Sequence, residues 1–252
     1  MIKAILERYR QGHRTMAYPD APLPLPPRFR GLPQLDGGRC AGGCKACVEA
    51  CPYGAISAEG QLTLDMGKCL FCGDCSRACP NDAVSFSNDA VLASRSREGL
   101  IVESGKEFQP ASGLEGELLR LFGRSLKLRE VSAGGCNACE ADTNVLSTIG
   151  WDLGRFGIQF VASPRHADGL FVTGPVSENM RLALLDTYAA VPEPKLVIVA
   201  GACAINGGPF KDHAEVHNGA DGLLPVDLYI PGCPPAPLTI LDGLLRLVKK
   251  IH

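Results

Sequence analysis

The stretch Cys69-Leu-Phe-Cys72-Gly-Asp-Cys75-Ser-Arg-Ala-Cys79-Pro80 decides the fold of the region around it. Two residues separate each of the first three cysteines from the next, and three residues separate the third from Cys79. This spacing is typical of a run that places three thiolates on one 4Fe–4S cube, while the fourth cysteine reaches a second cube. A run of this kind therefore predicts a partner run elsewhere in the chain.

The partner run lies upstream, in Cys40-Ala-Gly-Gly-Cys44-Lys-Ala-Cys47-Val-Glu-Ala-Cys51-Pro52. Together the two runs resemble those of bacterial two-cluster ferredoxins, in which the fourth cysteines are exchanged between the clusters. Zinc is the alternative, but zinc sites use pairs of close cysteines rather than triplets closed by Cys-Pro. We therefore expect two 4Fe–4S clusters with these ligands: Cys40, Cys44, Cys47 and Cys79 for the first, and Cys69, Cys72, Cys75 and Cys51 for the second.

The first run departs from the usual spacing at its first cysteine. Three residues, Ala-Gly-Gly, separate Cys40 from Cys44, where two are expected. Glycines can fold an extra residue into a bulge without steric cost. Whether Cys40 binds iron despite its additional spacer is left open by the sequence.

The composition limits the class of protein. The chain has 252 residues, 46% of them hydrophobic, and its formal charge of −2 gives no indication of nucleic-acid binding. Twelve cysteines would suit a short secreted disulfide protein, but the basic N-terminus does not resemble a signal peptide. The longest apolar run, Leu196–Ile205, is too short to span a membrane. We expect a cytoplasmic chain without a transmembrane span, whose cysteines are metal ligands.

Residues 1–35 are predicted to form a basic arm and a proline-rich strap. Apolar residues recur at helical spacing in its first turns, and Tyr18–Pro27 is expected to be extended because proline disfavours helix and sheet. Six Lys/Arg against two Asp/Glu give residues 1–35 a charge of +4. We expect the strap to lie against a partner protein, with an anionic membrane surface and a solvated arm as the alternatives.

The pattern divides the chain into an arm, a two-cluster module, a linker and a second domain, at residues 1–35, 36–92, 93–113 and 114–252. In the last part, stretches suited to strands alternate with stretches of helix length. We expect strands at 126–131, 158–161, 170–173, 196–199 and 226–230, and helices at 142–149, 178–191 and 237–251. Such alternation predicts a parallel sheet with helices on both faces. The expected architecture is thus an α+β ferredoxin module followed by a flavodoxin-like α/β domain.

The second domain contains four cysteines, all in Gly- or Pro-rich segments that are expected to be loops: Cys136, Cys139, Cys203 and Cys233. Three of these loops follow expected strands, and such loops converge at the carboxyl edge of an open α/β sheet. Four thiolates suit either zinc or an iron–sulfur cube. The two clusters expected upstream favour a third 4Fe–4S cluster.

The second half resembles the small iron–sulfur subunit shared by respiratory complex I and the membrane-bound (group 4) nickel–iron hydrogenases. The resemblance rests on five segments: Gly135–Glu140, Ser163–Asp168, Val172–Val176, Gly201–Gly208 and Tyr229–Pro235. The first half is similar to the two-cluster ferredoxin subunit of formate hydrogenlyase-type complexes, including Phe29–Pro33. The resemblance implies a fusion of two subunits that are normally separate.

The resemblance also implies a function. The chain would be a non-catalytic electron-transfer subunit that exchanges electrons with a large-subunit active site through three 4Fe–4S clusters. Two residues separate Cys136 from Cys139, as in the hydrogenase branch, whereas complex I proteins have two adjacent cysteines there. Alternatives are the equivalent subunit of a complex I-like quinone oxidoreductase or of a related complex without nickel, and a soluble ferredoxin-type carrier.

The implied partners are a hydrogenase- or complex I-type large subunit, membrane subunits and an electron donor or acceptor protein. These partners would hold the chain at the cytoplasmic side of the inner membrane. No residue is expected to be catalytic, and no nucleic acid is expected as a partner.

Four polar residues near the third set of cysteines are candidates for supporting roles. Glu140 and Asp142 follow Cys139 and are candidates for a proton relay, although acids at the start of a helix are often caps. Arg165 and His166 are candidates for tuning the cluster through charge or hydrogen bonding to sulfur. The alternative for this pair is an ordinary strand-to-helix loop.

Overall fold

A computed structural model describes residues 2–41 and 43–251. Its largest element is a parallel sheet of five strands in the order β10-β9-β8-β6-β7. The strands are β6 (Leu126–Ser132), β7 (Ile158–Phe160), β8 (Gly169–Thr173), β9 (Leu196–Ala200) and β10 (Leu228–Ile230). Numbered along this half alone, the order is 5-4-3-1-2, which is the flavodoxin-like arrangement. The expected fold class of the second half is confirmed.

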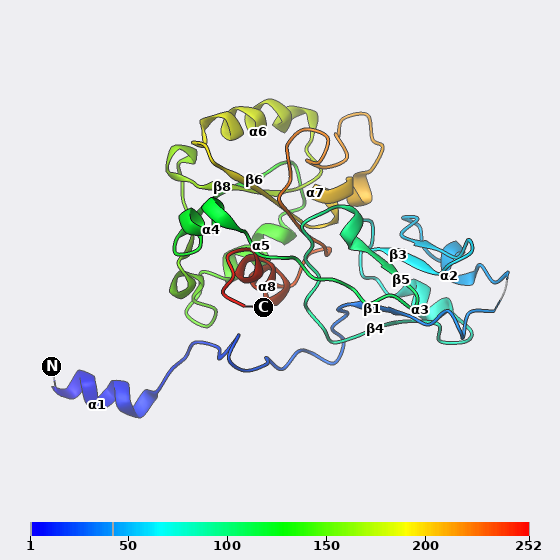
Figure 1. The fold of residues 1–252 in the computed structure, drawn as a ribbon, viewed down its shortest axis with the longest axis horizontal. Coiled ribbons are helices and arrows are strands. Elements are labelled where there is room, and N and C mark those ends of the chain that lie inside the picture. The colour runs from blue at the N-terminus through cyan, green and yellow to red at the C-terminus, as the bar shows by residue number, and fades with distance from the viewer. Residues whose placement is uncertain (1, 42, 252) are drawn as a thin grey trace.

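Helices cover both faces of this sheet, as Figure 1 shows. The helices α4 (Gly116–Phe122) and α8 (Pro237–Leu247) pack with the strands into one hydrophobic cluster. Helix α5 (Ala138–Val145) packs against α8, and Leu146 directly after it joins the same cluster. The helices α6 (Glu178–Ala190) and α7 (Ala202–Asn206) pack into the other. Strands β8 and β9 are buried along their whole length because both of their faces are covered.

The first half contains two small antiparallel sheets and two short helices. One sheet pairs β1 (Pro33–Leu35) with β4 (Val84–Phe86), and the other has the order β2-β3-β5. The remaining elements are β2 (Ile56–Ser57), β3 (Thr63–Asp65), β5 (Ile101–Glu103), α2 (Ala46–Glu49) and α3 (Asp74–Ala78). Each cysteine run thus contains a helix and leads to a strand, which confirms the ferredoxin-like α+β fold of this half.

Residues 93–113, expected as a linker, are more than a connection. Within them, β5 pairs with β3 and places Val102 opposite Leu64. Residues 94 and 229 form an isolated antiparallel bridge to the far edge of the parallel sheet. This segment is therefore hydrogen-bonded to both halves.

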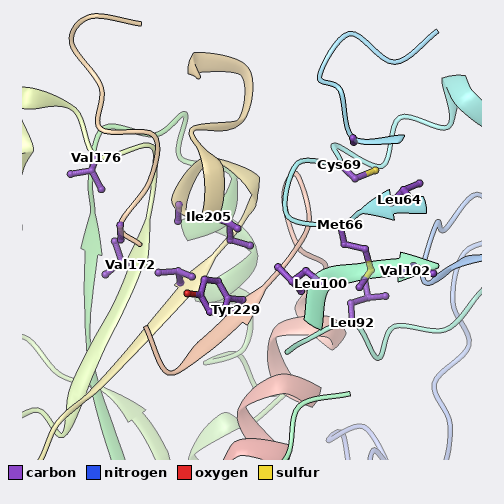
Figure 2. Close-up of a cluster of buried hydrophobic side chains, with 14 of the residues drawn as sticks. Leu64, Met66, Cys69, Leu92, Leu100, Val102, Val172, Val176, Ile205 and Tyr229 are labelled. Atoms are coloured by element: carbon purple, nitrogen blue, oxygen red, sulfur yellow. The ribbon is translucent and has the colours of Figure 1, made fainter. Parts of the chain in front are cut away.

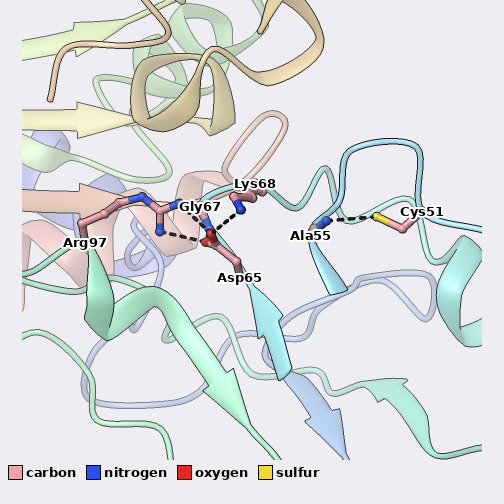
Figure 3. A network of polar contacts seen from close by, with 6 residues as sticks. All are labelled: Cys51, Ala55, Asp65, Gly67, Lys68 and Arg97. Atoms are coloured by element: carbon pink, nitrogen blue, oxygen red, sulfur yellow. Dashed lines mark hydrogen bonds and ion pairs between the residues drawn. The ribbon is translucent and has the colours of Figure 1, made fainter. Parts of the chain in front are cut away.

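The two halves share one hydrophobic cluster. Figure 2 shows Leu64, Met66 and Leu100 of the first half near Tyr229 of the second. Beside this junction, the Arg97 guanidinium donates two hydrogen bonds to the Asp65 carboxylate, of 2.8 and 2.7 Å (Figure 3). The Asp65 carboxylate also accepts a hydrogen bond of 2.9 Å from the backbone N–H of Gly67, in the turn that leads to the second cysteine run.

The arm (residues 1–35) consists of helix α1 (Ile2–Gln11) and the strap that follows it. The two differ in their contacts with the rest of the chain. Helix α1 buries none of its residues and projects away from the rest of the chain (Figure 1). Both ends of the strap hydrogen-bond to other parts of this chain. At its start, the hydroxyl of Tyr18 donates a 2.7 Å hydrogen bond to Asp242 of α8. At its end, Leu32 N–H donates to the carbonyl of Asp89 in the first half, at 2.9 Å.

The expected helix boundaries need correction. The helix predicted at 142–149 is α5, Ala138–Val145, and it begins four residues earlier than predicted. The helices predicted at 178–191 and 237–251 end at Ala190 and Leu247. None of the helices in the described ranges combines the length and the apolar character needed to cross a membrane.

Candidate iron–sulfur sites

The structure brings the eight cysteines of the first half together in two sets. One cavity is lined by Cys40, Cys44, Cys47 and Cys79, and a second by Cys51, Cys69, Cys72 and Cys75. Cys47 lies in α2 and Cys75 in α3, and these two helices pack against each other. The last cysteine of each run lies with the first three of the other run. This is the exchange that the two runs predict, although their role as ligands remains a prediction.

Burial makes these thiols poor acids in the absence of iron. Burial, reinforced by the neighbouring thiols of Cys79 and Cys40, raises the pKa of Cys47. Burial likewise raises the pKa of Cys69 to about 12 and that of Cys75 to about 11. Because only thiolates bind iron, loading of these sites would release protons.

Backbone N–H groups point at the sulfur that closes each run. Ala55 N–H donates to Cys51 Sγ at 3.4 Å, as Figure 3 shows, and Ala83 N–H donates to Cys79 Sγ at 3.2 Å. Each donor lies four residues after its cysteine, so the internal repeat extends to the hydrogen bonds. Hydrogen bonds to sulfur stabilise negative charge and are a means by which proteins set the potential of a bound cluster.

The third set lies at the carboxyl edge of the parallel sheet. Cys136 and Cys139 follow β6, Cys203 follows β9 and Cys233 follows β10. The expectation that all four lie in loops is wrong for two of them, since Cys139 is in the first turn of α5 and Cys203 in that of α7. The early start of α5 follows from Asn137, whose left-handed backbone (φ 70°) turns the chain directly into the helix.

The thiols of the third set influence one another. Burial raises the pKa of Cys139, and the neighbouring thiols of Cys203, Cys233 and Cys136 raise it further. Burial also raises the pKa of Cys203 to about 12, with additional effects of Cys233 and Cys136. The four thiols therefore form one group, as the convergence of loops in this fold predicts.

A glycine makes room for this group. Gly201, between β9 and α7, has a φ of +92°, and a Cβ atom there would lie 2.6 Å from Cys139 Sγ. A side chain at residue 201 would thus meet both backbone strain and a steric clash with a candidate ligand.

Four thiols in each set fit a 4Fe–4S cluster, which takes four cysteine ligands. Within residues 2–41 and 43–251, no three His, Cys, Asp or Glu side chains are close enough to hold one metal ion. A 4Fe–4S cluster does not require three side chains around one ion, because each of its cysteines binds a different iron. When bound, such clusters supply one-electron transfer.

Glu140 lies inside the protein next to the third set. Its carboxylate accepts hydrogen bonds from the hydroxyl groups of Ser132 and Thr173, the latter at 2.7 Å. Burial would raise the pKa of Glu140, but these hydrogen bonds lower it below its ordinary value. Asp142, in contrast, has a pKa raised by burial. The relay role of both residues remains a prediction.

Glu130 is a further acid that sequence reasoning missed. Burial, and then the negative charge of Glu140, raises the pKa of Glu130 to about 7. Its Oε1 atom is buried and has no hydrogen-bond partner among the described residues. The sequence did contain a signal for this residue. Alternate residues of a strand point to the same face, so Glu130 is on the face of the buried Leu126 and Leu128.

Arg165 and His166 are not brought to the third set. They form the end of the short 3-10 helix η3 (Pro164–His166), which precedes β8. The backbone of Asp168, two residues on, hydrogen-bonds to Lys127 at the start of β6, whereas Cys136 follows the end of that strand. Their expected tuning role is therefore corrected: both are exposed residues at the opposite end of the sheet.

A cleft lies between the second and third sets. From the first half it is lined by Leu70 and Phe71, which stand between Cys69 and Cys72. From the second half it is lined by Pro231–Pro237, which includes Cys233, and by Asp142 of α5. Residues 28–30 of the strap line it as well.

The fold and the cysteine sets define an iron–sulfur protein in which a two-cluster ferredoxin-like half precedes a flavodoxin-like half. Known families match both halves. The family described as "4Fe-4S dicluster domain" matches residues 39–83, and the family described as "NADH ubiquinone oxidoreductase, 20 Kd subunit" matches residues 136–247.

Three curated relatives illustrate the similarity. Formate hydrogenlyase subunit 7 of Escherichia coli is 40% identical over 166 residues, which are 64% of this chain and 65% of the relative. The probable membrane-bound hydrogenase subunit mbhJ of Pyrococcus furiosus is 38% identical over 54% of this chain and 81% of the relative. An NADH-quinone oxidoreductase subunit of Clostridium beijerinckii is 46% identical over 46% of this chain and 70% of the relative.

This chain belongs to the family of the 20 kDa subunit of NADH ubiquinone oxidoreductase. The resemblance seen in the sequence is thereby confirmed. The match to formate hydrogenlyase subunit 7 spans just under two thirds of that protein's length.

Proposed function

We propose that this chain is the electron-transfer small subunit of a membrane-associated nickel–iron hydrogenase or formate hydrogenlyase-like complex. It would carry electrons through three 4Fe–4S clusters to or from an active site in a large partner subunit. The observation that carries the proposal is the grouping of all twelve cysteines into three sets of four within one chain.

The proposed ligands follow these sets. Cys40, Cys44, Cys47 and Cys79 hold the first cluster, and Cys51, Cys69, Cys72 and Cys75 hold the second. Cys136, Cys139, Cys203 and Cys233 hold the third. The chain's own part is to fix the thiolates and to direct N–H donors at sulfur.

The proposed division of the chain keeps the arm at 1–35, the two-cluster module at 36–92 and the third-cluster domain at 114–252. Residues 93–113 connect them and add β5 to the first half.

Helix α1 remains available for docking, because its apolar residues Ile2, Ile5 and Tyr9 are 75%, 65% and 88% exposed.

The proposed partners are a large subunit that covers the edge around Cys136 and Cys233, both of which are exposed, and membrane subunits. An electron donor or acceptor protein would meet the first cluster. The proposed location is the cytoplasmic side of the inner membrane, where partners hold the chain. The hydrogenase assignment is supported by the Cys136–Cys139 spacing and by two of the named relatives.

A second candidate is the equivalent subunit of a complex I-like quinone oxidoreductase or of a related complex without nickel. The observation that favours it is the 46% identity to an NADH-quinone oxidoreductase subunit. The two candidates differ in the partner, because only the hydrogenase requires a nickel site in the large subunit.

One experiment tests both. The chain is purified anaerobically with its native partners, and iron, sulfide, nickel and dihydrogen-linked dye reduction are measured. We expect about twelve iron and about twelve sulfide per chain, with nickel in the large subunit and dye reduction by dihydrogen. Full clusters without nickel would favour the quinone-linked candidate. Zinc in place of iron would contradict both.

A further inference from the structure

The strap is fixed on both sides of the cleft between the second and third cysteine sets. Tyr18 holds it to α8 of the second half. Gly31 N–H donates to the carbonyl of Ser87 in the first half at 2.8 Å. A Cβ atom at Gly31 would lie 1.9 Å from the Asp89 carbonyl oxygen, so the strap is in close backbone contact there. Residues 28–30 are thus held over the cleft by anchors at either end.

Arg30 is the strap residue that contacts the loop of the second set. Its Nη1 atom donates a 3.2 Å hydrogen bond to the carbonyl oxygen of Phe71, between Cys69 and Cys72. Its side chain also passes close to Gly73, where a Cβ atom would lie 2.7 Å from Arg30 Nε. The guanidinium therefore lies against the backbone that presents two of the four thiols.

Phe71 connects this contact to the candidate ligands. Its backbone is left-handed (φ 54°), which is uncommon for a bulky residue. Its N–H donates to Cys69 Sγ at 3.3 Å, while its carbonyl accepts from Arg30. One peptide segment thus links the guanidinium to a sulfur of the second set, and the observed strain indicates a conformation held by its surroundings.

The charge of Arg30 is not cancelled by a partner. Within the described residues, no carboxylate lies within ion-pair distance of Arg30, whereas Arg77 near the same set is paired with Asp74. The other charged residues of the cleft are Arg28 from the strap and Asp142 from α5. Among the described residues, Arg30 is the one arginine of the cleft that hydrogen-bonds to the ligand loop. Arg77, which is outside the cleft and paired with Asp74, also donates to this loop, at the carbonyl oxygen of Cys72.

We infer that Arg30 raises the reduction potential of the cluster held by Cys51, Cys69, Cys72 and Cys75. The inference rests on the proposed function, since it requires that cluster and the third cluster across the cleft. The redox change is the addition of one electron to the cluster, with no bond made or broken. A positive charge beside the cluster favours the state with the extra negative charge. Arg30 thereby sets how an electron is shared between the second and third clusters.

The test is an EPR-monitored redox titration of the intact chain, purified anaerobically as wild type, Arg30→Gln, Arg30→Lys and Arg28→Gln. We expect Arg30→Gln to lower the potential of one cluster signal and shift the electron toward the third cluster about tenfold, or about 59 mV for one electron. Arg30→Lys keeps the charge and should retain most of the wild-type potential. Arg28→Gln removes a charge from the same cleft at a residue that, among the described residues, makes no hydrogen bond to the ligand loop, and it should shift the signal much less.

Two results would overturn the inference. One is an unchanged set of potentials in Arg30→Gln chains that hold the wild-type iron content. The other is an equal shift in Arg28→Gln or Arg30→Lys, which would indicate a general or purely structural effect. The proposed function fails in a different way, through fewer than three cluster signals in the wild type itself.

Discussion

At the scale of single residues, Cys40 lies with the rest of its set in spite of its irregular spacer. The spacer of Cys40 is one residue longer than usual, yet Cys40 lines the same cavity as Cys44, Cys47 and Cys79. The central residue of the spacer, Gly42, lies outside the described residues, so the expected bulge stays a prediction.

The prediction for Cys40 is loss of one cluster. Cys40→Ser should lower the iron content by about four per chain, because the first cluster would lack one of its four thiolates. Cys44→Ser is the matched control, since its spacing to Cys47 is regular. Iron and sulfide assays on anaerobically purified protein measure the change. Full iron content in Cys40→Ser but not in Cys44→Ser would show that Cys40 is not a ligand.

Gly201 gives a second prediction at this scale. Gly201→Ala should destabilise the chain by about 1–3 kcal/mol, because a left-handed backbone and a contact with Cys139 Sγ both oppose a side chain. We expect loss of the third cluster's EPR signal along with a lower apparent urea midpoint. Gly222→Ala is the control, since a Cβ atom there meets nothing within 4 Å. Equal effects of the two substitutions would contradict this account.

Glu130 gives a pH-dependent prediction. Its pKa of about 7 in the folded chain is above the ordinary 4.5, so the folded state holds the proton more tightly. The associated stability is complete below about pH 4.5 and is lost as the pH rises through about 7. Glu130→Gln should therefore be more stable than wild type by about 1–3 kcal/mol at pH 8, with little difference at pH 5.

Apparent urea midpoints at the two pH values measure this difference. Glu107→Gln is the control, because Glu107 is exposed. A gain that is the same at both pH values would show that the removed charge is not its cause.

At the scale of elements, the long strands and helices of the second half were predictable, and the short elements were not. Strands such as β8 and β9 are continuous apolar runs, which reflects burial on both faces. In contrast, β5 has three residues, too few to show a periodic pattern, and exists because β3 offers it a partner. The start of α5 was missed because Gly-Gly-Cys-Asn is typical of a loop, and a single left-handed residue decides where the helix begins.

The strap shows a different limit of sequence reasoning. Its proline content predicts an extended conformation but does not say what the strap lies on. The contact of Tyr18 with Asp242 joins residues 224 positions apart, which no local pattern encodes. No local pattern encodes the position of Arg165 and His166 either. After the short strand β7, the chain returns to the edge of the sheet where the parallel strands begin.

The strap prediction concerns its anchor. Tyr18→Phe removes the donor to the Asp242 carboxylate, which is 1% exposed and, among the described residues, keeps Arg246 as its one other side-chain partner. We expect a loss of about 1.5–3 kcal/mol in the free energy of unfolding. Tyr9→Phe in the exposed helix α1 is the control and should change little. A smaller loss in Tyr18→Phe than in this control would mean that the strap does not stabilise the chain.

At the scale of the whole molecule, we predict that the two halves unfold together. Leu100 is fully buried where the halves meet, in the cluster that includes Met66 and Tyr229. Leu100→Ala should cost about 2–5 kcal/mol through the cavity it leaves, and unfolding should remain a single transition. Leu121→Ala, at a residue 43% exposed, is the control.

Limited proteolysis provides the second readout. If the halves share one core, Leu100→Ala should accelerate digestion of the whole chain. A stable fragment that corresponds to either half would contradict the prediction.

The architecture as a whole followed from the cysteine runs and the alternation of elements, whereas the relation between the halves did not. Each run predicts its own ligand exchange because the spacing reports a local geometry. The shared core at Leu100 and the ion pair of Arg97 with Asp65 arise from shapes that form only after both halves have folded.

Residues 93–113 join the two halves in one polypeptide, so the assembly of the halves is independent of protein concentration. Separate subunits dissociate on dilution, and one can be produced in excess of the other. Two units on one polypeptide meet at an effective concentration set by their connection, which dilution does not change. Their ratio is therefore one to one in every molecule.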